Sequence, residues 1–482
     1  MTDGASKLIP DEAVDLAADP ALFPPRTERT RYDDALSESL IAAGERVASG
    51  AVTPTLDLAA LRRDLIGFDF TAPRSTETLF AWVVDQLERG VTHMTHPRYF
   101  GLFNPAPTYP AQAADRIVAA FNPQLATSTT SPAAIEIEAH TIRAVARRAG
   151  LPAETGGHFT TGGAEANYTA LICALTRAHP DFATRGARAF AGNPVVYVSR
   201  DSHLAWFKIA HQAGIGRDAV RLIATDGTGR MDPAPLLGAI AADRSAGCVP
   251  VMIVATAGTT NAGMIDPLPA CTAIARDIGI WFHVDAAWGG GLIASDRLRG
   301  ALCGMEGADS VTIDAHKWFA TTMGCGMFFI RHADILSAAF RVSNEFMPSN
   351  IGGVDPYASS VQWSRRFLGL RLFMSLAAAG WSGHARHVER AVMLAAKLEK
   401  ALTSRGWTVA NRASLAVVCA EPPPGSVDVR TIVGRVLASG RAWISVAMFE
   451  GRPVVRACVT HGETSLNDIA ALVEALEAAR GQ

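Results

Sequence analysis

The sequence predicts an α/β protein built on a mainly parallel sheet with helices on both faces. Short apolar or β-branched runs follow one another between residues 194 and 330. Those up to residue 313 recur about every 25–30 residues, with Ala-rich amphipathic stretches between them, which is the spacing of repeated βαβ units. The runs are PVVYVS (194–199), VRLIA (220–224), VPVMIVA (249–255), IWFHV (280–284), SVTI (310–313) and GMFFI (326–330).

Three regions are expected along the 482 residues. Residues 1–107 form an N-terminal arm and a helical segment, and residues 108–371 form the large domain that holds the sheet. Residues 372–482 combine a long helical stretch with the short runs LAVVC and VVRACV, which predicts a small α+β domain. In the N-terminal segment, ETLFAWVVDQLERGV places four apolar residues on one helical stripe: Leu79, Trp82, Val83 and Leu87.

Composition gives no basis for binding nucleic acid or a membrane surface, because the net charge is -2 and the pI is about 6.7. No apolar run approaches the roughly 18 residues that would cross a membrane, and the first residues lack the apolar core of a signal peptide. The seven cysteines are scattered without CxxC spacing. This pattern predicts reduced thiols in the cytoplasm, with neither a disulfide framework nor a metal site.

Chemically capable side chains fall where several of the predicted strands end. Ligands of open α/β sheets gather at the carboxyl ends of the strands, so these side chains are expected to lie close together. Upstream of them, TTGGAEAN is a glycine-rich loop that opens into a helix at about Gly163. The strand-end residues are Asp285 after WFHV, His203 in VSRDSH, Thr259 in ATAGTT, and Asp314, His316 and Lys317 in DAHKW.

Taken singly, these residues have simpler explanations. Asp285 could cap a turn, His203 could be structural, and the charge of Lys317 could reach solvent. The glycine loop could equally be a helix cap. Taken together and in this order, they indicate a site for pyridoxal phosphate, an aromatic, phosphorylated cofactor that forms an imine with a lysine.

The chemistry of that cofactor requires these residue types. Apolar surroundings favour the uncharged amine of Lys317, the form that can make an imine. An ionised Asp285 keeps the pyridine nitrogen protonated, and the flat ring of His203 stacks on the cofactor. The free backbone N–H groups of a helix that starts at Gly163 and Ala164 suit the phosphate.

At these residues the sequence resembles the group II pyridoxal-phosphate-dependent decarboxylases. This family includes the aromatic amino acid, glutamate and diaminobutyrate decarboxylases. The resemblance runs from about residue 75 to 460 and rests on HVDAAWGG, DAHKW, TTGGAEAN, ATAGTT, and SH followed by Lys208. It implies a fold-type-I, aspartate-aminotransferase-like architecture with a mainly parallel seven-stranded sheet. It also implies a homodimer whose active site is shared between subunits, with the N-terminal segment at the interface.

The resemblance implies a role for each matching residue. Lys317 is the imine lysine, Asp285 the partner of the ring nitrogen, and His203 the stacking residue that also helps in catalysis. Ala287 is implied to pack on the opposite face of the ring, and Thr259 to lie near both the ring and Asp285. The implied phosphate contacts are Gly163, Ala164 and His316, together with Ser364 of QWSRRF from the neighbouring subunit.

The predicted substrate pocket departs from that of the aromatic-substrate relatives. Those enzymes line the pocket with aromatic side chains, of which only Phe103 is retained here. The other positions are occupied by Met94, Leu102, Gln124 and Ala126. This replacement favours an aliphatic, polar or extended amino acid as substrate.

A second departure lies in AFRVSNEFMPSN. Amine-forming relatives carry in this loop a tyrosine that helps protonate the carbanion left after CO₂ departs, and the register places Phe346 there. Phenylalanine has no proton to give, so the quinonoid intermediate would persist. Relatives with this exchange let oxygen trap it, which yields an aldehyde. A one-residue shift in register would instead leave another residue to supply the proton.

The leading hypothesis is therefore an L-amino acid decarboxylase in which Phe346 favours decarboxylation-coupled oxidative deamination. Three alternatives stay open. They are simple amine formation, β-elimination from a cysteine S-conjugate as in relatives from lincosamide-type antibiotic pathways, and a catalytically silent structural homologue.

Overall fold

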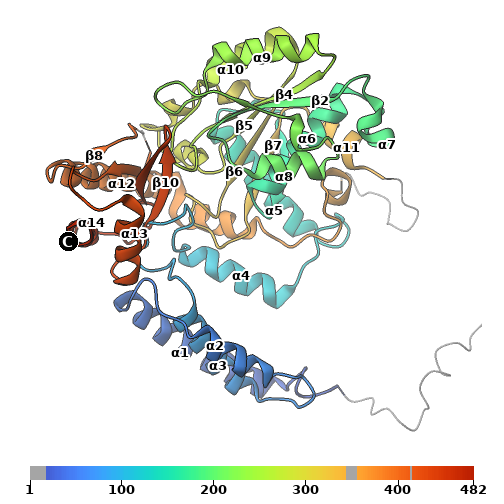
Figure 1. The fold of residues 1–482 in the computed structure, drawn as a ribbon. Coiled ribbons are helices and arrows are strands. Elements are labelled where there is room, and N and C mark those ends of the chain that lie inside the picture. The colour runs from blue at the N-terminus through green and yellow to red at the C-terminus, as the bar shows by residue number, and fades with distance from the viewer. Residues whose placement is uncertain (1–17, 343–354, 413–414, 482) are drawn as a thin grey trace, which may run out of the picture. The chain divides into compact units, whose positions relative to one another are not determined.

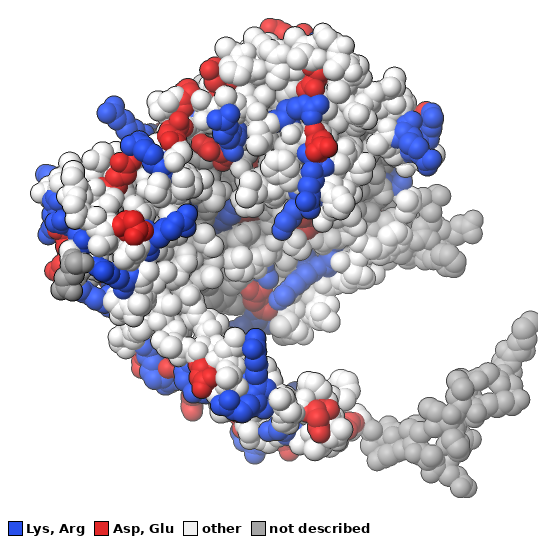
Figure 2. All heavy atoms as spheres, in the orientation of Figure 1, with Lys and Arg blue, Asp and Glu red and all other residues white. Residues whose placement is uncertain are grey.

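The structure is a computed structural model that describes residues 18–342, 355–412 and 415–481. Its residues divide into two compact units, and the division falls between His93 and Met94. The predicted boundaries at residues 107 and 371 remain predictions. Among the helices that the described residues form, none combines the length and apolar character needed to cross a membrane. On the face drawn in Figure 2, basic and acidic side chains are intermixed.

The first unit is helical. The ion pair of Arg46 with Glu88, at 2.7 Å, joins its first and third helices. Only part of the predicted apolar stripe is covered within the unit, because Val83 and Leu87 remain 44% and 54% exposed. The helices are α1 (Arg26–Ser49), α2 (Leu58–Ile66) and α3 (Thr76–Gly90).

A seven-stranded sheet forms the centre of the second unit, in the order β1-β7-β6-β5-β4-β2-β3. The expected mainly parallel sheet is confirmed, since β7 alone runs opposite to the other six strands. The glycine-rich GGHFT of β1 was not predicted as a strand. The strands are β1 (Gly156–Thr160), β2 (Pro194–Ser199), β3 (Val220–Ile223), β4 (Val249–Thr256), β5 (Trp281–Asp285), β6 (Ser310–Asp314) and β7 (Gly326–Ile330).

Helices cover both faces of this sheet, and the strands are buried on both (Figure 1). Along β2, Val196 and Val198 pack into one core, whereas Val195 and Tyr197 pack into the other. This alternation explains why the strands read as continuous apolar runs. The first core includes α6 (Gly163–Ala178), α8 (Ala205–Gln212) and α11 (Asp334–Phe340), and the second includes α5 (Pro132–Arg148), α9 (Pro233–Ser245) and α10 (Leu268–Ile278).

The C-terminal part of this unit contains a four-stranded antiparallel sheet in the order β10-β11-β9-β8. The long helix α12 leads into it and is broken at Gly380, whose φ of 63° is accessible to glycine at little cost. The elements are α12 (Leu370–Thr403), β8 (Thr408–Val409), β9 (Val417–Glu421), α13 (Val429–Ala438), β10 (Ser445–Phe449), β11 (Arg452–Cys458) and α14 (Leu466–Arg480), with α4 (Tyr109–Phe121) and α7 (Phe182–Arg185) earlier in the chain.

Candidate active site

The sheet brings the carboxyl ends of β2, β4, β5 and β6 to one edge. Asp285 is the last residue of β5 and Asp314 the last of β6. In the strand register, Thr256 at the end of β4 lies opposite Asp285. The hydroxyl of Thr256 also contacts that of Ser202, 2.7 Å away, beside His203. The predicted strand-end residues therefore share one edge of the sheet.

Lys317 lies in a turn directly after β6. Its Nζ is 3.2 Å from Oδ2 of Asp314, and its side chain is 24% exposed. The ring of Phe103 lies 5.8 Å from the same nitrogen. The uncharged amine expected for Lys317 stays a prediction. The side chain keeps some access to solvent, and its nitrogen lies beside a carboxylate.

Asp285 is buried, at 5% exposure, and its carboxylate is held by hydrogen bonds to both oxygens. Oδ1 accepts the backbone N–H of Ala287 at 3.1 Å. Oδ2 accepts the side-chain amide of Asn167 at 2.8 Å. Hydrogen bonds of this kind favour the charged form of a carboxyl group. The arrangement therefore suits a carboxylate that faces a positively charged ring nitrogen.

The N-terminus of α6 lies beside Asp314. The helix begins after Gly162, whose φ is 156°, and no described side chain caps it. A Cβ on Gly163 would lie 3.0 Å from Oδ2 of Asp314 and 3.3 Å from Cβ of Ala287. Ala164, in the first turn, is exposed. The uncapped N–H groups and the small residues leave room for a phosphate.

His316 lies next to this helix start, since a Cβ on Gly162 would come within 3.5 Å of its Cε1. Its Nδ1 lies 3.1 Å from the backbone O and 3.2 Å from the backbone N of Cys325. Burial lowers the pKa of His316, and the nearby Asp314 opposes this shift. Burial therefore favours the neutral imidazole, whose Nε2 lies 3.8 Å from Oδ2 of Asp314.

The other predicted cofactor contacts are placed differently. His203 is exposed, and its Nδ1 accepts the backbone N–H of Ala205 at 3.1 Å. Ala287 is buried beside Gly163 and Asp285. The hydroxyl of Thr259 accepts the backbone N–H of Met264 and so closes a local turn. Among the described residues no hydrogen bond joins that hydroxyl to Asp285.

The predicted substrate residues are only partly brought together. Phe103 is buried and stacks on Trp288, with ring centroids 4.2 Å apart. Met94 and Leu102 are 40% and 49% exposed. Sequence reasoning missed Arg456, a buried residue whose guanidinium carbon lies 4.7 Å from the Phe103 ring. Both Lys317 and Arg456 therefore approach the ring of Phe103.

Gln124 and Ser364 contact each other and not Lys317. The amide of Gln124 donates to the hydroxyl of Ser364 at 3.0 Å, and both residues are exposed. Gln124 also lines a cavity of about 550 Å³ between α4 and α5, with Phe121 and Phe367. Phe346 lies outside the described residues.

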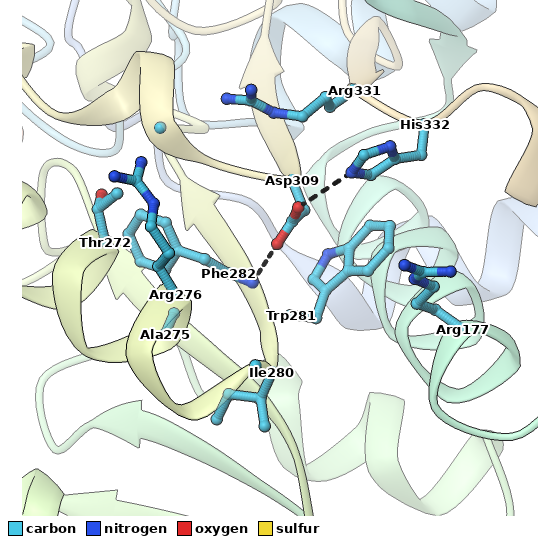
Figure 3. A pocket seen from close by; sticks show the side chains of 12 residues that line it. Arg177, Thr272, Ala275, Arg276, Ile280, Trp281, Phe282, Asp309, Arg331 and His332 are labelled. Atoms are coloured by element: carbon cyan, nitrogen blue, oxygen red, sulfur yellow. Dashed lines mark hydrogen bonds and ion pairs between the residues drawn. The ribbon is translucent and has the colours of Figure 1, made fainter.

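The cavity drawn in Figure 3 lies at the opposite edge of the sheet from Lys317. It has a volume of about 300 Å³ and is lined by the amino-terminal ends of β5 and β6. Asp309 accepts the backbone N–H of Phe282 and lies 3.4 Å from His332. None of the predicted site residues lines this cavity. Within the described ranges, no three His, Cys, Asp or Glu side chains are grouped as metal ligands.

The sequence analysis also did not predict Asn167 and His283 as neighbours of Asp285, although the sequence carries a signal for each. His283 and Asp285 are two residues apart on a strand and so point to the same face. Asn167 lies four residues beyond Gly163, one helical turn into α6.

The residues at this edge of the sheet supply a lysine amine, a fixed carboxylate and an open helix N-terminus. This set fits pyridoxal phosphate.

Comparisons with known proteins agree with this set. The family model described as "Pyridoxal-dependent decarboxylase conserved domain" matches residues 66–420. Tryptophan decarboxylase 2 of Oryza sativa subsp. japonica is 29% identical over 412 residues, which cover 81% of this chain and 82% of that protein. The L-2,4-diaminobutyrate decarboxylase of Rhizobium meliloti (strain 1021) is 35% identical over 292 residues, or 60% of this chain and 57% of that protein.

Among solved structures, Oryza sativa TDC with PLP and tryptamine has a TM-score of 0.90 and 25% identity, covering 96% of this chain and 99% of that one. These findings confirm the resemblance, the fold class and the cofactor inferred from the sequence. The chain belongs to the pyridoxal-dependent decarboxylase family and is an enzyme that uses pyridoxal 5'-phosphate.

Proposed function

We propose that this enzyme decarboxylates an L-amino acid with a non-aromatic or extended side chain, and that Phe346 directs the reaction toward oxidative deamination to an aldehyde. The observation that carries the first part is the pairing of Lys317 with Asp314 at the end of β6, on the same sheet edge as the fixed carboxylate of Asp285. The second part rests on the sequence register at Phe346.

In this proposal each residue has a defined task. Lys317 binds the cofactor covalently, and Asp285 faces its ring nitrogen. His203 covers one face of the ring and Ala287 the other, while the α6 N-terminus holds the phosphate. The bound cofactor supplies an electron-withdrawing ring that accepts the electron pair released when the carboxylate leaves. The protein contributes position and charge at stated atoms.

The proposed substrate class rests on the residues around Phe103. Phe103 is stacked on Trp288 and flanked by the buried Arg456, so its ring is already engaged by the protein. Met94 and Leu102 offer flexible aliphatic surface at positions that we expect to be aromatic in enzymes for tyrosine or tryptophan. The similarity to a diaminobutyrate decarboxylase is compatible with this class.

The proposed product follows from Phe346. A phenyl ring cannot return a proton to the substrate carbon after CO₂ leaves, so molecular oxygen becomes the acceptor. The balanced reaction consumes one amino acid, one O₂ and one H₂O. It forms one aldehyde, one CO₂, one NH₃ and one H₂O₂. Simple amine formation remains the alternative if another residue supplies the proton.

We further propose a cytoplasmic homodimer with a shared active site. Gln124 and Ser364 are exposed together, which suits residues that complete the site of a partner subunit. Residues 1–107 would contribute to that interface, and the exposed Val83 and Leu87 of α3 support this placement. The free thiols of the cysteines suit a reducing compartment.

A single assay tests the proposed function. The purified enzyme with cofactor is incubated with a panel of L-amino acids, and CO₂, amine, aldehyde and peroxide are followed together. We expect CO₂, aldehyde and peroxide in equal amounts from an aliphatic, polar or extended substrate. Amine without oxygen uptake would contradict the oxidative branch, and pyruvate with a thiol from a cysteine S-conjugate would identify β-elimination. The Lys317→Ala variant is the control for enzyme-catalysed turnover.

A further inference from the structure

A chain of four side-chain hydrogen bonds runs from Asp285 into the interior of the sheet. Oδ2 of Asp285 accepts the amide of Asn167 at 2.8 Å, and Oδ1 of Asn167 lies 3.0 Å from Nε2 of His283. Nδ1 of His283 lies 2.8 Å from the hydroxyl of Ser310, which accepts the indole N–H of Trp281 at 2.8 Å. All five residues are at most 5% exposed, so water does not replace these bonds.

The chemistry of the members sets the direction of every hydrogen in the chain. Asn167 must present its NH₂ group to the carboxylate, so its oxygen faces His283 and requires a donor there. Burial lowers the pKa of His283 to about 4, so the imidazole is neutral and carries its one hydrogen on Nε2. Its Nδ1 is then an acceptor, and the hydroxyl of Ser310 donates to it.

The hydroxyl oxygen of Ser310 in turn accepts from Trp281, whose indole can only donate. Every hydrogen therefore points along the chain toward Asp285. Hydrogen bonds aligned in this way polarise one another and strengthen the last donor. The last donor, the amide of Asn167, stabilises the negative charge of Asp285. At the outer end, Trp281 lines the cavity of Figure 3.

We propose that Asn167, His283 and Ser310 are positioning residues that hold the carboxylate of Asp285 oriented toward the ring nitrogen of pyridoxal phosphate. Among the residues that the structure describes, Asn167 is the hydrogen-bond donor to Oδ2, and the backbone of Ala287 donates to Oδ1. The proposal rests on the cofactor and not on the substrate or product proposed above, so its test uses neither.

The test compares two cofactors on the purified full-length apoenzyme. One is pyridoxal phosphate, and the other is its analogue with C–H in place of the ring nitrogen. The analogue cannot bond to Asp285, so its affinity does not depend on how that carboxylate is held. For Asn167→Ala we expect the Kd of pyridoxal phosphate to rise about tenfold. Loss of a residue that hydrogen-bonds a ligand-binding side chain typically weakens binding about 10- to 100-fold, and this value is the lower end of that range. The Kd of the analogue should stay within about twofold of its wild-type value. That change is well below the tenfold that corresponds to about 1.4 kcal/mol.

Two variants of His283 separate the loss of its hydrogen bond to Asn167 from the loss of its packing. In His283→Gln the amide can still donate from the place of Nε2 to Asn167, whereas His283→Leu fills similar space without a donor. We expect the glutamine variant to retain most of the selectivity for pyridoxal phosphate over the analogue and the leucine variant to lose it. Equal selectivity in these two variants would contradict the proposal.

Asn411 provides a matched control for loss of a buried amide. It is 2% exposed and its side chain binds the backbone of Ala262, Val417 and Cys419, with no link to Asp285. Asn411→Ala should lower thermal stability without changing the ratio of the two Kd values. The proposal is overturned if Asn167→Ala weakens both cofactors equally or changes neither. Ser310→Ala, a milder change, gives the same readout if Asn167→Ala does not fold.

Discussion

The amine of Lys317 lies 3.2 Å from the carboxylate of Asp314, three residues earlier in the chain. The pair explains how a lysine is tolerated beside Trp318 and Phe319, both of which are buried. It also places a negative charge beside the helix start that we expect to bind phosphate. We therefore expect the carboxylate of Asp314 to slow cofactor capture, because its negative charge opposes an approaching phosphate.

Replacing Asp314 with asparagine should accelerate cofactor capture. The amide keeps the shape of the side chain but removes the negative charge beside Lys317 and the expected phosphate site. A partly exposed ion pair contributes up to about 1 kcal/mol, which corresponds to about fivefold. We expect a rise of about this size in the rate at which the absorption of the bound cofactor appears, measured by stopped flow at neutral pH. A slower rate in Asp314→Asn would show that the carboxylate assists the step.

Adding a methyl group at Gly163 should weaken cofactor binding. The new Cβ would lie 3.0 Å from Asp314 and 3.3 Å from Ala287, in the space assigned to the phosphate. We expect the Kd of pyridoxal phosphate, measured by titration of the apoenzyme, to rise about tenfold, which corresponds to about 1.4 kcal/mol. Gly238→Ala in α9 is the matched control because nothing lies within 4 Å of its added Cβ. Equal affinities for the two variants would remove Gly163 from the phosphate site.

Replacing Phe346 with tyrosine should change the product. The hydroxyl would supply the proton that phenylalanine lacks, and general acid catalysis of this kind contributes about 10²–10⁴-fold. We expect the amount of peroxide formed per CO₂ to fall at least about tenfold and amine to replace the aldehyde. The measurement is the product ratio at equal turnover. An unchanged ratio would mean that another residue controls protonation.

Acid should destabilise the fold through His158. Burial lowers its pKa from 6.5 to about 3, and neither ring nitrogen has a hydrogen-bond partner among the described residues. Above pH 6.5 this residue is neutral in both the folded and the unfolded chain, so it does not lower the free energy of unfolding. As the pH falls from 6.5 toward 3, only the unfolded chain takes up the proton, so the free energy of unfolding decreases. At pH 5.0 the loss is about 2 kcal/mol, from about 1.4 kcal/mol per pH unit below 6.5.

The matched variant is His158→Phe, which cannot take up a proton and lies beside Phe328. Urea unfolding at pH 7.5 and pH 5.0 gives the free energy of unfolding of each protein. We expect the wild type to lose about 2 kcal/mol more than the variant between these two pH values. Equal losses would indicate that His158 is protonated in the folded protein or that the acid effect arises elsewhere.

The sequence predicts the features that depend on local pattern. Apolar runs that end in a polar residue locate β5 with Asp285 and β6 with Asp314 to within a residue. The strand β1 was missed because its two glycines carry no apolar signal. The predicted helix with its apolar stripe is confirmed as α3, but a periodic pattern does not tell which surface covers Val83 and Leu87.

Contacts between distant segments were harder to predict. Asn167 and His283 are 116 residues apart, so their bond depends on how α6 packs against the sheet. The ion pair of Lys317 was missed for another reason: apolar neighbours in the sequence indicated burial, whereas the turn after β6 leaves the amine partly open to solvent. The role assigned to Ser364 depends on a second subunit, and this role and the pocket role of Gln124 stay predictions.

The most direct measurement locates the cofactor on the chain. The enzyme loaded with pyridoxal phosphate is reduced with borohydride, digested, and the peptide that carries the pyridoxyl group is identified by mass spectrometry. The account predicts that Lys317 carries the group, and that Lys317→Arg, which keeps a cation beside Asp314, carries none. A pyridoxyl group on Lys208, or an equal amount on Lys317→Arg, would contradict it.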